Sequence, residues 1–169
     1  KDTWRSKIKT QGGGELIDTG YYPCYRMLYL AGSTVESVKA QMGRFYHPIE
    51  GEDTASVQVR FANGVLGEIL TSWAFSNPYG SYQIHVIGEE GQLFGSGSKL
   101  YYLPAGFNEP SLKVMKDGDT FGDQIAHFVH CIKTHTRPLH SVAEGRAVLE
   151  IILSSAESAK GWDKKRSAG

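Results

Sequence analysis

Residues 54–75, TASVQVRFANGVLGEILTSWAF, decide the fold class of this chain. Every second residue from Ala55 to Phe61 is apolar, and the residues between them are polar. This period of two is typical of a strand that buries one face. Asn63-Gly64 then supplies a strong hairpin signal, in which both turn positions are expected to take positive φ. The stretch therefore predicts two antiparallel strands joined by a tight turn.

The same alternation extends from Thr34 to about Leu103. The runs are separated by short connections, which favour a largely antiparallel sheet of about six strands. The expected strands cover residues 34–46, 54–62, 65–75, 81–87, 91–95 and 99–103.

A helical pattern precedes the strands, over Glu15 to Leu30, and Gly32 is expected to stop it. Pro23 interrupts this pattern because it has no N–H and clashes with the carbonyl four residues earlier. The helix must therefore kink at Pro23, or its regular part must begin there with Pro23 in the first turn.

Two further helices are expected after the strands. The first covers about 121–134, with Thr120 as its N-cap. The second opens with a capping box of Ser141 and Glu144. Its apolar stripe is expected to comprise Val148, Leu149, Ile152, Ala156 and Ala159.

This order of elements predicts an α+β fold, an open and mostly antiparallel sheet with helices on one face. The other face of the sheet would be partly apolar, and such a face suggests a protein partner. Its expected members are Gln58, Arg60, His85 and some of Leu66, Leu70 and Trp73, and the surface around Arg60, Trp73 and His85 is expected to be buried against a second copy.

Length and composition narrow the function classes. The 169 residues suffice for one packed domain and are few for two, so we expect a single domain over 1–169. Eighteen basic residues balance eighteen acidic ones, which argues against nucleic-acid binding and against a polybasic membrane surface. No apolar stretch reaches about 18 residues, so neither a membrane span nor a signal peptide is expected. The chain begins without Met on Lys1, as a trimmed domain would.

The two cysteines, Cys24 and Cys131, lie outside any Cys-x-x-Cys spacing. They are expected to be reduced thiols of an intracellular, cytoplasmic protein. Cys131 shares an expected helix face with His127 and His130, a set of residue types that can bind a metal. That helix offers no fourth ligand and no acidic second shell, so we expect a solvated or interface face and no metal.

The triple glycine 12–14 invites comparison with a phosphate-binding loop. It lacks the Gly-x-Gly-x-x-Gly spacing, and no strand precedes it. A tight loop entering a helix, where only glycine fits, is the expected structure. A Gly-x-Ser-x-Gly nucleophile motif does not occur in the sequence.

Asp18, Tyr22 and Tyr25 are spaced i, i+4 and i+7. On an unbroken helix they would present a carboxylate and two phenols on one face, which could hold a polyhydroxyl substrate. Alternatively, Asp18 bonds to local backbone near Pro23, and the tyrosines pack under the sheet with satisfied hydroxyls. Spacing does not decide between these two interpretations.

Four segments, in order, resemble the Gfo/Idh/MocA family of oxidoreductases. GGGELIDTGYYPCYRMLYLAG is similar to the opening of its second domain, G-G-G-x-L-x-D-x-G-x-H-x-x-D, followed by a helix and a glycine stop. EDTASVQVRFANGVLGEILTSW resembles its first long hairpin, and IHVIGEEGQL its next strand turn. The segment from FGDQIAHF to SAESAKG resembles its closing pair of helices. The resemblance covers nearly the whole chain.

The resemblance implies roles for four residues. In the family, the motif aspartate helps place the substrate hydroxyl, and a histidine four residues later assists proton transfer. These positions are Asp18 and Tyr22, so both are candidate catalytic residues, although a phenol needs a depressed pKa or a nearby lysine to act as a base. Tyr25 replaces the final aspartate of the motif, and Arg5 corresponds to a Trp-Arg segment before the glycines. Both are candidate substrate-binding residues.

As a whole, the resemblance implies the C-terminal, substrate-binding and oligomerisation domain of an NAD- or NADP-dependent dehydrogenase acting on a sugar, cyclitol or related diol. The family's nucleotide-binding glycines and Glu-Lys-Pro motif belong to its first domain and do not occur here. No cofactor-binding residue is therefore expected in this chain, and the fragment alone should be inactive. A homo-oligomer, such as a dimer through the sheet face, is expected. The alternative is a non-catalytic assembly or ligand-binding module with the same fold.

Overall fold

The computed structural model describes residues 3–74, 83–96, 99–114 and 118–166. The chain divides into two compact units, one formed by Lys1–Ser76 with Leu139–Gly169 and the other by Asn77–Pro138. All strand pairs of the described residues are antiparallel, and the chain also contains helices. The α+β class and the open antiparallel pairing are therefore confirmed. Seven strands are present in the described residues, divided between a three-stranded and a four-stranded sheet.

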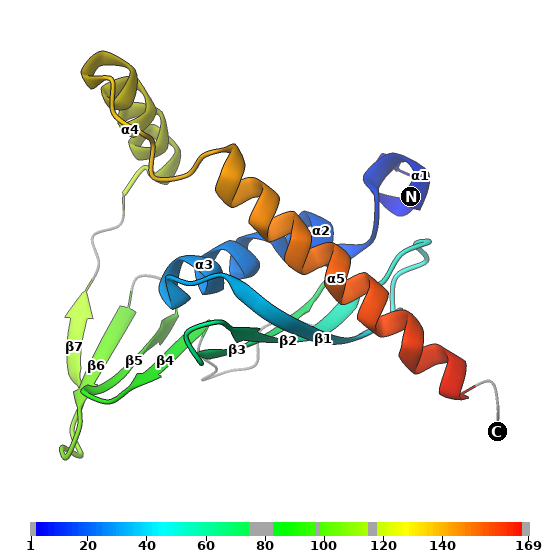
Figure 1. Cartoon of the computed structure of the whole chain (residues 1–169), viewed down its shortest axis with the longest axis horizontal. Helices are drawn as coiled ribbons and strands as arrows, with labels where there is room; N and C mark the ends of the chain where they lie inside the picture. Colours follow the sequence, from blue (N-terminus) through cyan, green and yellow to red (C-terminus); the bar gives the residue numbers. More distant parts are fainter. Residues whose placement is uncertain (1–2, 75–82, 97–98, 115–117, 167–169) are drawn as a thin grey trace. The chain divides into compact units, whose positions relative to one another are not determined.

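The first unit contains a sheet with strand order β1-β2-β3. Three of its helices, α2, α3 and α5, lie on one face of this sheet, as expected (Figure 1). The elements of this unit are η1 (Trp4–Ser6), α1 (Ile8–Gln11), α2 (Glu15–Asp18), α3 (Tyr21–Ala31), β1 (Val35–Gly43), β2 (Thr54–Phe61), β3 (Leu66–Ser72) and α5 (Val142–Arg166).

The core of this unit lies between β2 and the helices. The alternating apolar residues from Ala55 to Phe61 are all buried, as the period of two predicts. Burying each large apolar side chain contributes about 1.5–3 kcal/mol, so this strand anchors the unit. The stripe that α5 adds is Val148, Ile151, Ile152 and Ser155, whereas Leu149 and Ala156 are exposed. The buried stripe therefore shares Val148 and Ile152 with the expected one, but it includes Ser155 in place of Ala156.

The predicted hairpin is present, but its turn differs from the expected one. Phe61 N–H donates to the Val65 carbonyl, and Gly64 N–H donates to the Phe61 carbonyl, both at 2.9 Å. Only Gly64 of the turn has a positive φ, 88°. The loop has one residue more than a two-residue turn, so a single left-handed position suffices. The Asn63 amide is instead used to donate to the Ala31 carbonyl at the end of α3.

The helical pattern over residues 15–30 is divided into α2 and α3. Pro23 is the third residue of α3, so its missing N–H falls in the first turn, where helices lack internal acceptors. This is the second of the two arrangements that the sequence allowed. The unbroken helix that would have placed Asp18 and Tyr22 on one face is absent from this described segment.

The outer face of the first sheet carries Gln58, Arg60, Leu66 and Leu70, all exposed as expected. Trp73 was wrongly assigned to this face, because its indole N–H donates to the Thr19 hydroxyl on the helix side. Side chains alternate along a strand, so odd-numbered residues at the end of β3 face opposite to Leu66 and Leu70. His85 belongs to the second unit.

The second unit contains a sheet with strand order β4-β5-β6-β7. Its elements are β4 (Ile84–Gly88), β5 (Gly91–Ser96), β6 (Lys99–Pro104), β7 (Ser111–Val114) and α4 (Thr120–Thr134). The four-residue β7 was not predicted, because so short a run shows little alternation. Asp119, and not Thr120, is the N-cap of α4, since its carboxylate accepts from Gly122 N–H at 2.9 Å. Positions 75, 81 and 82 of the expected strands lie outside the described residues.

Candidate functional site

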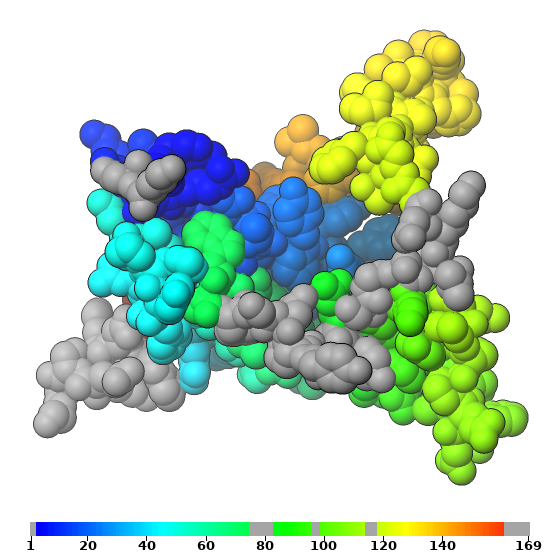
Figure 2. Space-filling view, turned by 180° about the vertical axis from the view of Figure 1, so that it is seen from behind, coloured from blue at the N-terminus to red at the C-terminus, as the bar shows by residue number. Residues whose placement is uncertain are grey.

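The N-terminal segment is fixed on the loop that follows β1. Glu50 donates its N–H to the Ser6 carbonyl at 2.9 Å, and its carboxylate accepts from Ile8 N–H at 2.8 Å. The two segments, dark blue and cyan, lie side by side in the space-filling view (Figure 2). Within the segment, the Thr10 hydroxyl donates to the Trp4 carbonyl at 2.6 Å. These bonds hold the residue between them, Arg5, in a defined position.

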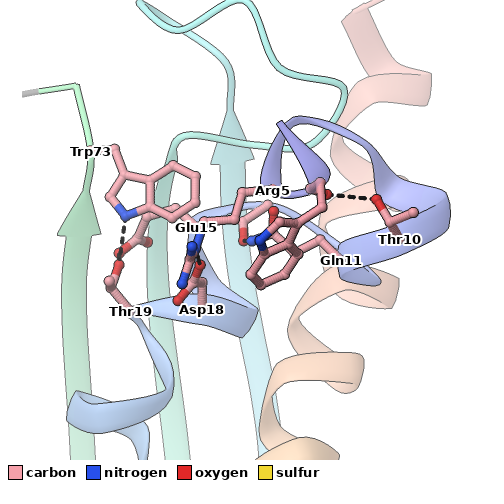
Figure 3. A network of polar contacts seen from close by, with 9 residues as sticks. Arg5, Thr10, Gln11, Glu15, Asp18, Thr19 and Trp73 are labelled. Atoms are coloured by element: carbon pink, nitrogen blue, oxygen red, sulfur yellow. Dashed lines mark hydrogen bonds and ion pairs between the residues drawn. The ribbon is translucent and has the colours of Figure 1, made fainter. Parts of the chain in front are cut away.

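Arg5 and Asp18, both predicted site residues, form an ion pair (Figure 3). The Arg5 Nε donates to Asp18 Oδ2 at 2.6 Å, and the guanidinium carbon lies 4.3 Å from the centre of the Trp4 ring. The Arg5 side chain is 54% exposed and that of Asp18 22%. A cation stacked on an aromatic face and a carboxylate are thus presented together to solvent.

The triple glycine places α2, and hence Asp18, against the loop before β2. Glu15 N–H donates to the Glu52 carbonyl at 2.8 Å, and Leu16 N–H to the Glu52 carboxylate at 3.0 Å. A Cβ on Gly14 would lie 2.0 Å from the Glu52 carbonyl oxygen, so no larger residue fits. The glycines therefore serve a close backbone approach, as the tight-loop interpretation requires.

A buried polar network lies beside the ion pair, and no motif in the sequence indicates it. Glu15 is 1% exposed, and its Oε1 accepts from the hydroxyls of Thr19 at 2.7 Å and Thr71 at 2.6 Å. Trp73 Nε1 donates to the same Thr19 hydroxyl at 2.7 Å (Figure 3). Burial raises the pKa of Glu15 above its ordinary value, and the carboxylates of Glu52 and Asp18 add to this, while the two hydroxyls oppose it. The only sequence signal was an acidic residue beside the core residue Leu16.

The tyrosines predicted for the site lie on α3. Tyr22 is 66% exposed, and its ring packs edge-on against Tyr21. Tyr25 packs edge-on against the ring of His140 at 4.4 Å, and the Tyr21 hydroxyl lies 3.3 Å from His140 Nε2. Burial raises the pKa of Tyr21 and of Tyr25, so both phenols keep their protons near neutral pH and can donate hydrogen bonds.

Tyr25 also lines a groove of about 790 Å³ between α3, β1 and α5. Leu28, Val38 and Ile151 contribute apolar walls, and Glu144 also lines the groove. The structure thus brings Arg5 and Asp18 together, and it places Tyr25 in a second cluster with Tyr21 and His140. The sequence indicated no such role for His140, because its tyrosine neighbours are more than 100 positions away in the chain.

In residues 3–74, 83–96, 99–114 and 118–166, no three His, Cys, Asp or Glu side chains gather as a metal site would require. Cys131 Sγ lies 3.5 Å from His127 Nε2 on α4. No helix of this part of the chain has the length and apolar character to cross a bilayer.

The fold is similar to that of several solved oxidoreductases. An aldose-aldose oxidoreductase from Caulobacter crescentus, crystallised with glycerol, matches with a TM-score of 0.80, at 21% identity over 95% of this chain and 49% of that one. An oxidoreductase from Agrobacterium radiobacter, in complex with NAD+, L-tartaric acid and magnesium, matches with a TM-score of 0.76, at 15% identity over 93% of this chain and 49% of that one. The WlbA dehydrogenase from Bordetella pertussis, in complex with NADH and UDP-GlcNAcA, matches with a TM-score of 0.64, at 19% identity over 94% of this chain and 46% of that one. The chain spans about half the length of these structures.

Sequence comparison assigns the family. No curated protein sequence matches the chain. A profile of the GFO/IDH/MocA C-terminal domain matches residues 1–94, which include the triple glycine, Asp18 and the first three strands. The chain therefore belongs to the GFO/IDH/MocA C-terminal domain family.

Proposed function

We propose that this chain is the substrate-binding and oligomerisation domain of an NAD- or NADP-dependent oxidoreductase that acts on a sugar, cyclitol or related diol. The supporting observation is that a member of this family presents its motif aspartate, Asp18, as a partly exposed side chain paired with the more exposed Arg5. Such a pair can bind vicinal oxygens, because the carboxylate accepts from hydroxyls and the guanidinium donates to them.

The nicotinamide cofactor, which would exchange a hydride with the substrate carbon, is not expected to be held by the described residues. Within the triple glycine, Gly14 lies directly against the Glu52 backbone, which leaves no room for a phosphate on that side of the loop. We assign cofactor binding to the part of the polypeptide outside this chain. This chain then contributes substrate contacts, and alone it would be inactive.

Each candidate residue has a proposed task. Asp18 would accept a hydrogen bond from a substrate hydroxyl, and Arg5 would donate to a neighbouring oxygen. Tyr22, with its ring largely in solvent, is free to meet a substrate and would transfer the proton of the reacting hydroxyl. Tyr25 keeps its proton and would serve as a hydrogen-bond donor.

Steady-state kinetics of the intact polypeptide test these tasks. Tyr22→Phe removes one hydroxyl and should lower kcat by about 10²–10⁴-fold if the phenol transfers a proton. Asp18→Asn should raise KM and lower kcat together, because it weakens both placement and charge. Tyr29→Phe is the matched control, since it removes an exposed phenol from the same helix. Thermal melts of all three variants separate chemistry from folding.

Normal turnover of Tyr22→Phe would remove that residue from the chemistry. Absence of any dehydrogenase activity in the intact polypeptide, across sugars, cyclitols and both cofactors, would favour the non-catalytic module instead. The sequence preceding Lys1 gives an independent check, because a Gly-x-Gly-x-x-Gly strand-turn-helix and a Glu-Lys-Pro motif there would support the enzyme.

A further inference from the structure

We propose that Glu15 is a positioning residue of the Arg5–Asp18 site, and that it ties α2 to β3 as a neutral carboxylic acid. The inference rests on the proposed function for its catalytic meaning, but its structural part concerns this chain alone. Asp18 touches the substrate in the proposed function, and Glu15 acts through Asp18.

The contacts of Glu15 fix the helical turn that carries Asp18. The residue opens α2, and Asp18 closes it three residues later. Its Oε1 receives one hydroxyl from Thr19, directly after α2, and one from Thr71 on β3. The same oxygen atom therefore links the two ends of this single turn to each other, through Thr19, and links the turn to the sheet, through Thr71. A helix of four residues has little stability of its own, so these bonds contribute to the position of Asp18, together with the bonds from α2 to Glu52.

The surroundings of Glu15 disfavour a negative charge. Its second oxygen, Oε2, is buried and has no hydrogen-bond partner among the described residues. The charged groups that face it are the carboxylates of Glu52 and Asp18, and the thiol of Cys24 faces it from α3. Arg5, the nearby cation, is bonded to Asp18. A buried carboxylate without a paired cation is costly, and a bound proton lowers that cost because it removes the charge.

The first experiment measures stability against pH. Glu15→Gln keeps an oxygen that accepts from both threonines and cannot ionise. A group whose folded-state pKa is raised stabilises the fold below its unfolded pKa, and that stabilisation is lost as the pH rises through the folded pKa. The folding constant of the Glu15→Gln variant, divided by that of the wild type, should be constant below about pH 4.5. This ratio should then increase by about tenfold per pH unit until the folded pKa is reached.

Glu68→Gln is the matched control, because it makes the same chemical change at an exposed position of β3. Its ratio should show no comparable increase from about pH 4 to about pH 9 in urea titrations, because its carboxyl contacts water in both the folded and the unfolded state. A constant ratio for Glu15→Gln as well would overturn the neutral acid.

The second experiment reads the position of Asp18 without any substrate. The Arg5 Nε–H should give a protected signal in a ¹H–¹⁵N spectrum of this chain, because it donates to Asp18. Glu15→Ala and the milder Thr71→Val should each abolish the protection, and Glu15→Gln should keep it. Retention of the protected signal in a folded Thr71→Val variant would overturn the positioning role.

In the intact polypeptide, Thr71→Val should raise KM by about tenfold with a smaller effect on kcat, and Thr71→Ser should restore KM, as expected when a residue acts on substrate placement. If Asp18→Asn impairs the enzyme and Thr71→Val leaves KM unchanged, the positioning role fails while the proposed function stands. If the polypeptide has no activity but the Arg5 signal responds as described, the proposed function fails and the structural role of Glu15 stands.

Discussion

Asp53 is a single buried residue that holds the loop between β1 and β2. Its carboxylate accepts from the backbone N–H groups of Phe45, Tyr46 and His47 at 2.8–3.0 Å, and from the Thr54 hydroxyl at 3.0 Å. Burial alone would raise the pKa of Asp53, but these four donors outweigh it and lower the pKa to about 2. The same loop meets the segment that carries Arg5, so Asp53 supports the site from a distance.

Asp53→Asn should therefore lower the free energy of unfolding at pH 7 by about 2 kcal/mol or more, because an amide accepts fewer of these bonds and leaves donors unpaired. The contribution of the Asp53 carboxyl to stability depends on pH in the opposite direction to that of Glu15. It is fully present above the ordinary pKa of 3.8 and is lost as the pH falls toward 2. The free energy of unfolding should decrease by about 2 kcal/mol over this pH range from this group. Urea titrations from acid to neutral pH measure it, with Glu68→Gln as control. An unchanged stability at neutral pH would contradict the prediction.

At the residue scale, the motif pointed to two residues that the structure joins, whereas residues that depend on distant partners were missed. The substrate-binding and catalytic roles of Arg5, Asp18, Tyr22 and Tyr25 stay predictions. Arg5 and Asp18 came from the resemblance, and the structure joins them. Glu15 could not be found, because its importance depends on Thr71, which is distant in the sequence. The prediction that Trp73 lies on the outer face was wrong, because Trp73 is an odd number of residues from Leu70 and side chains alternate between the faces of a strand.

At the scale of elements, α2 depends on the absence of a side chain at Gly14. Gly14→Ala should lower the free energy of unfolding by several kcal/mol, because its Cβ would overlap the Glu52 carbonyl and push α2 away. Gly145→Ala is the matched control in α5. Its Cβ would meet no atom closer than 3.6 Å, so it should stabilise the helix by about 0.5–1 kcal/mol. Denaturant unfolding of both variants checks the contrast, and equal effects would contradict it.

Elements were predicted well where the pattern was long. The hairpin of β2 and β3 followed from alternation, and its strands lie close to the expected bounds. The turn type could not be read, because Asn63 is recruited by the Ala31 carbonyl, a contact between distant segments. Pro23 indicated that the first helical pattern is interrupted, but it did not show that the break lies between Asp18 and Tyr21.

At the scale of the whole molecule, the outer face of the first sheet is the proposed oligomer surface. Leu66 is 72% exposed and Leu70 68%, beside the polar residues Gln58 and Arg60. Covering such side chains contributes about 1.5–3 kcal/mol each, so binding of a second copy to this face would be stabilised by their burial. Leu70→Lys should raise the dissociation constant of the oligomer by about tenfold or more in sedimentation experiments, because it replaces that apolar contact with a charge.

Leu153→Lys is the control for this prediction, because Leu153 on α5 is 60% exposed and lies away from the sheet face. It should leave the oligomer unchanged. A wild-type chain that sediments as a monomer at micromolar concentration would contradict the assignment of this face.

The two cysteines offer a means of following each unit separately. Cys24 lies in the core of the first unit and Cys131 in α4 of the second, and both are free and buried. Burial, reinforced by Glu15, raises the pKa of Cys24 to about 12, so this thiol should react with alkylating reagents only when its unit opens. Pulsed alkylation followed by peptide mass analysis would then record two opening rates from one unmodified chain, and a substrate of the Arg5–Asp18 site should slow labelling at Cys24.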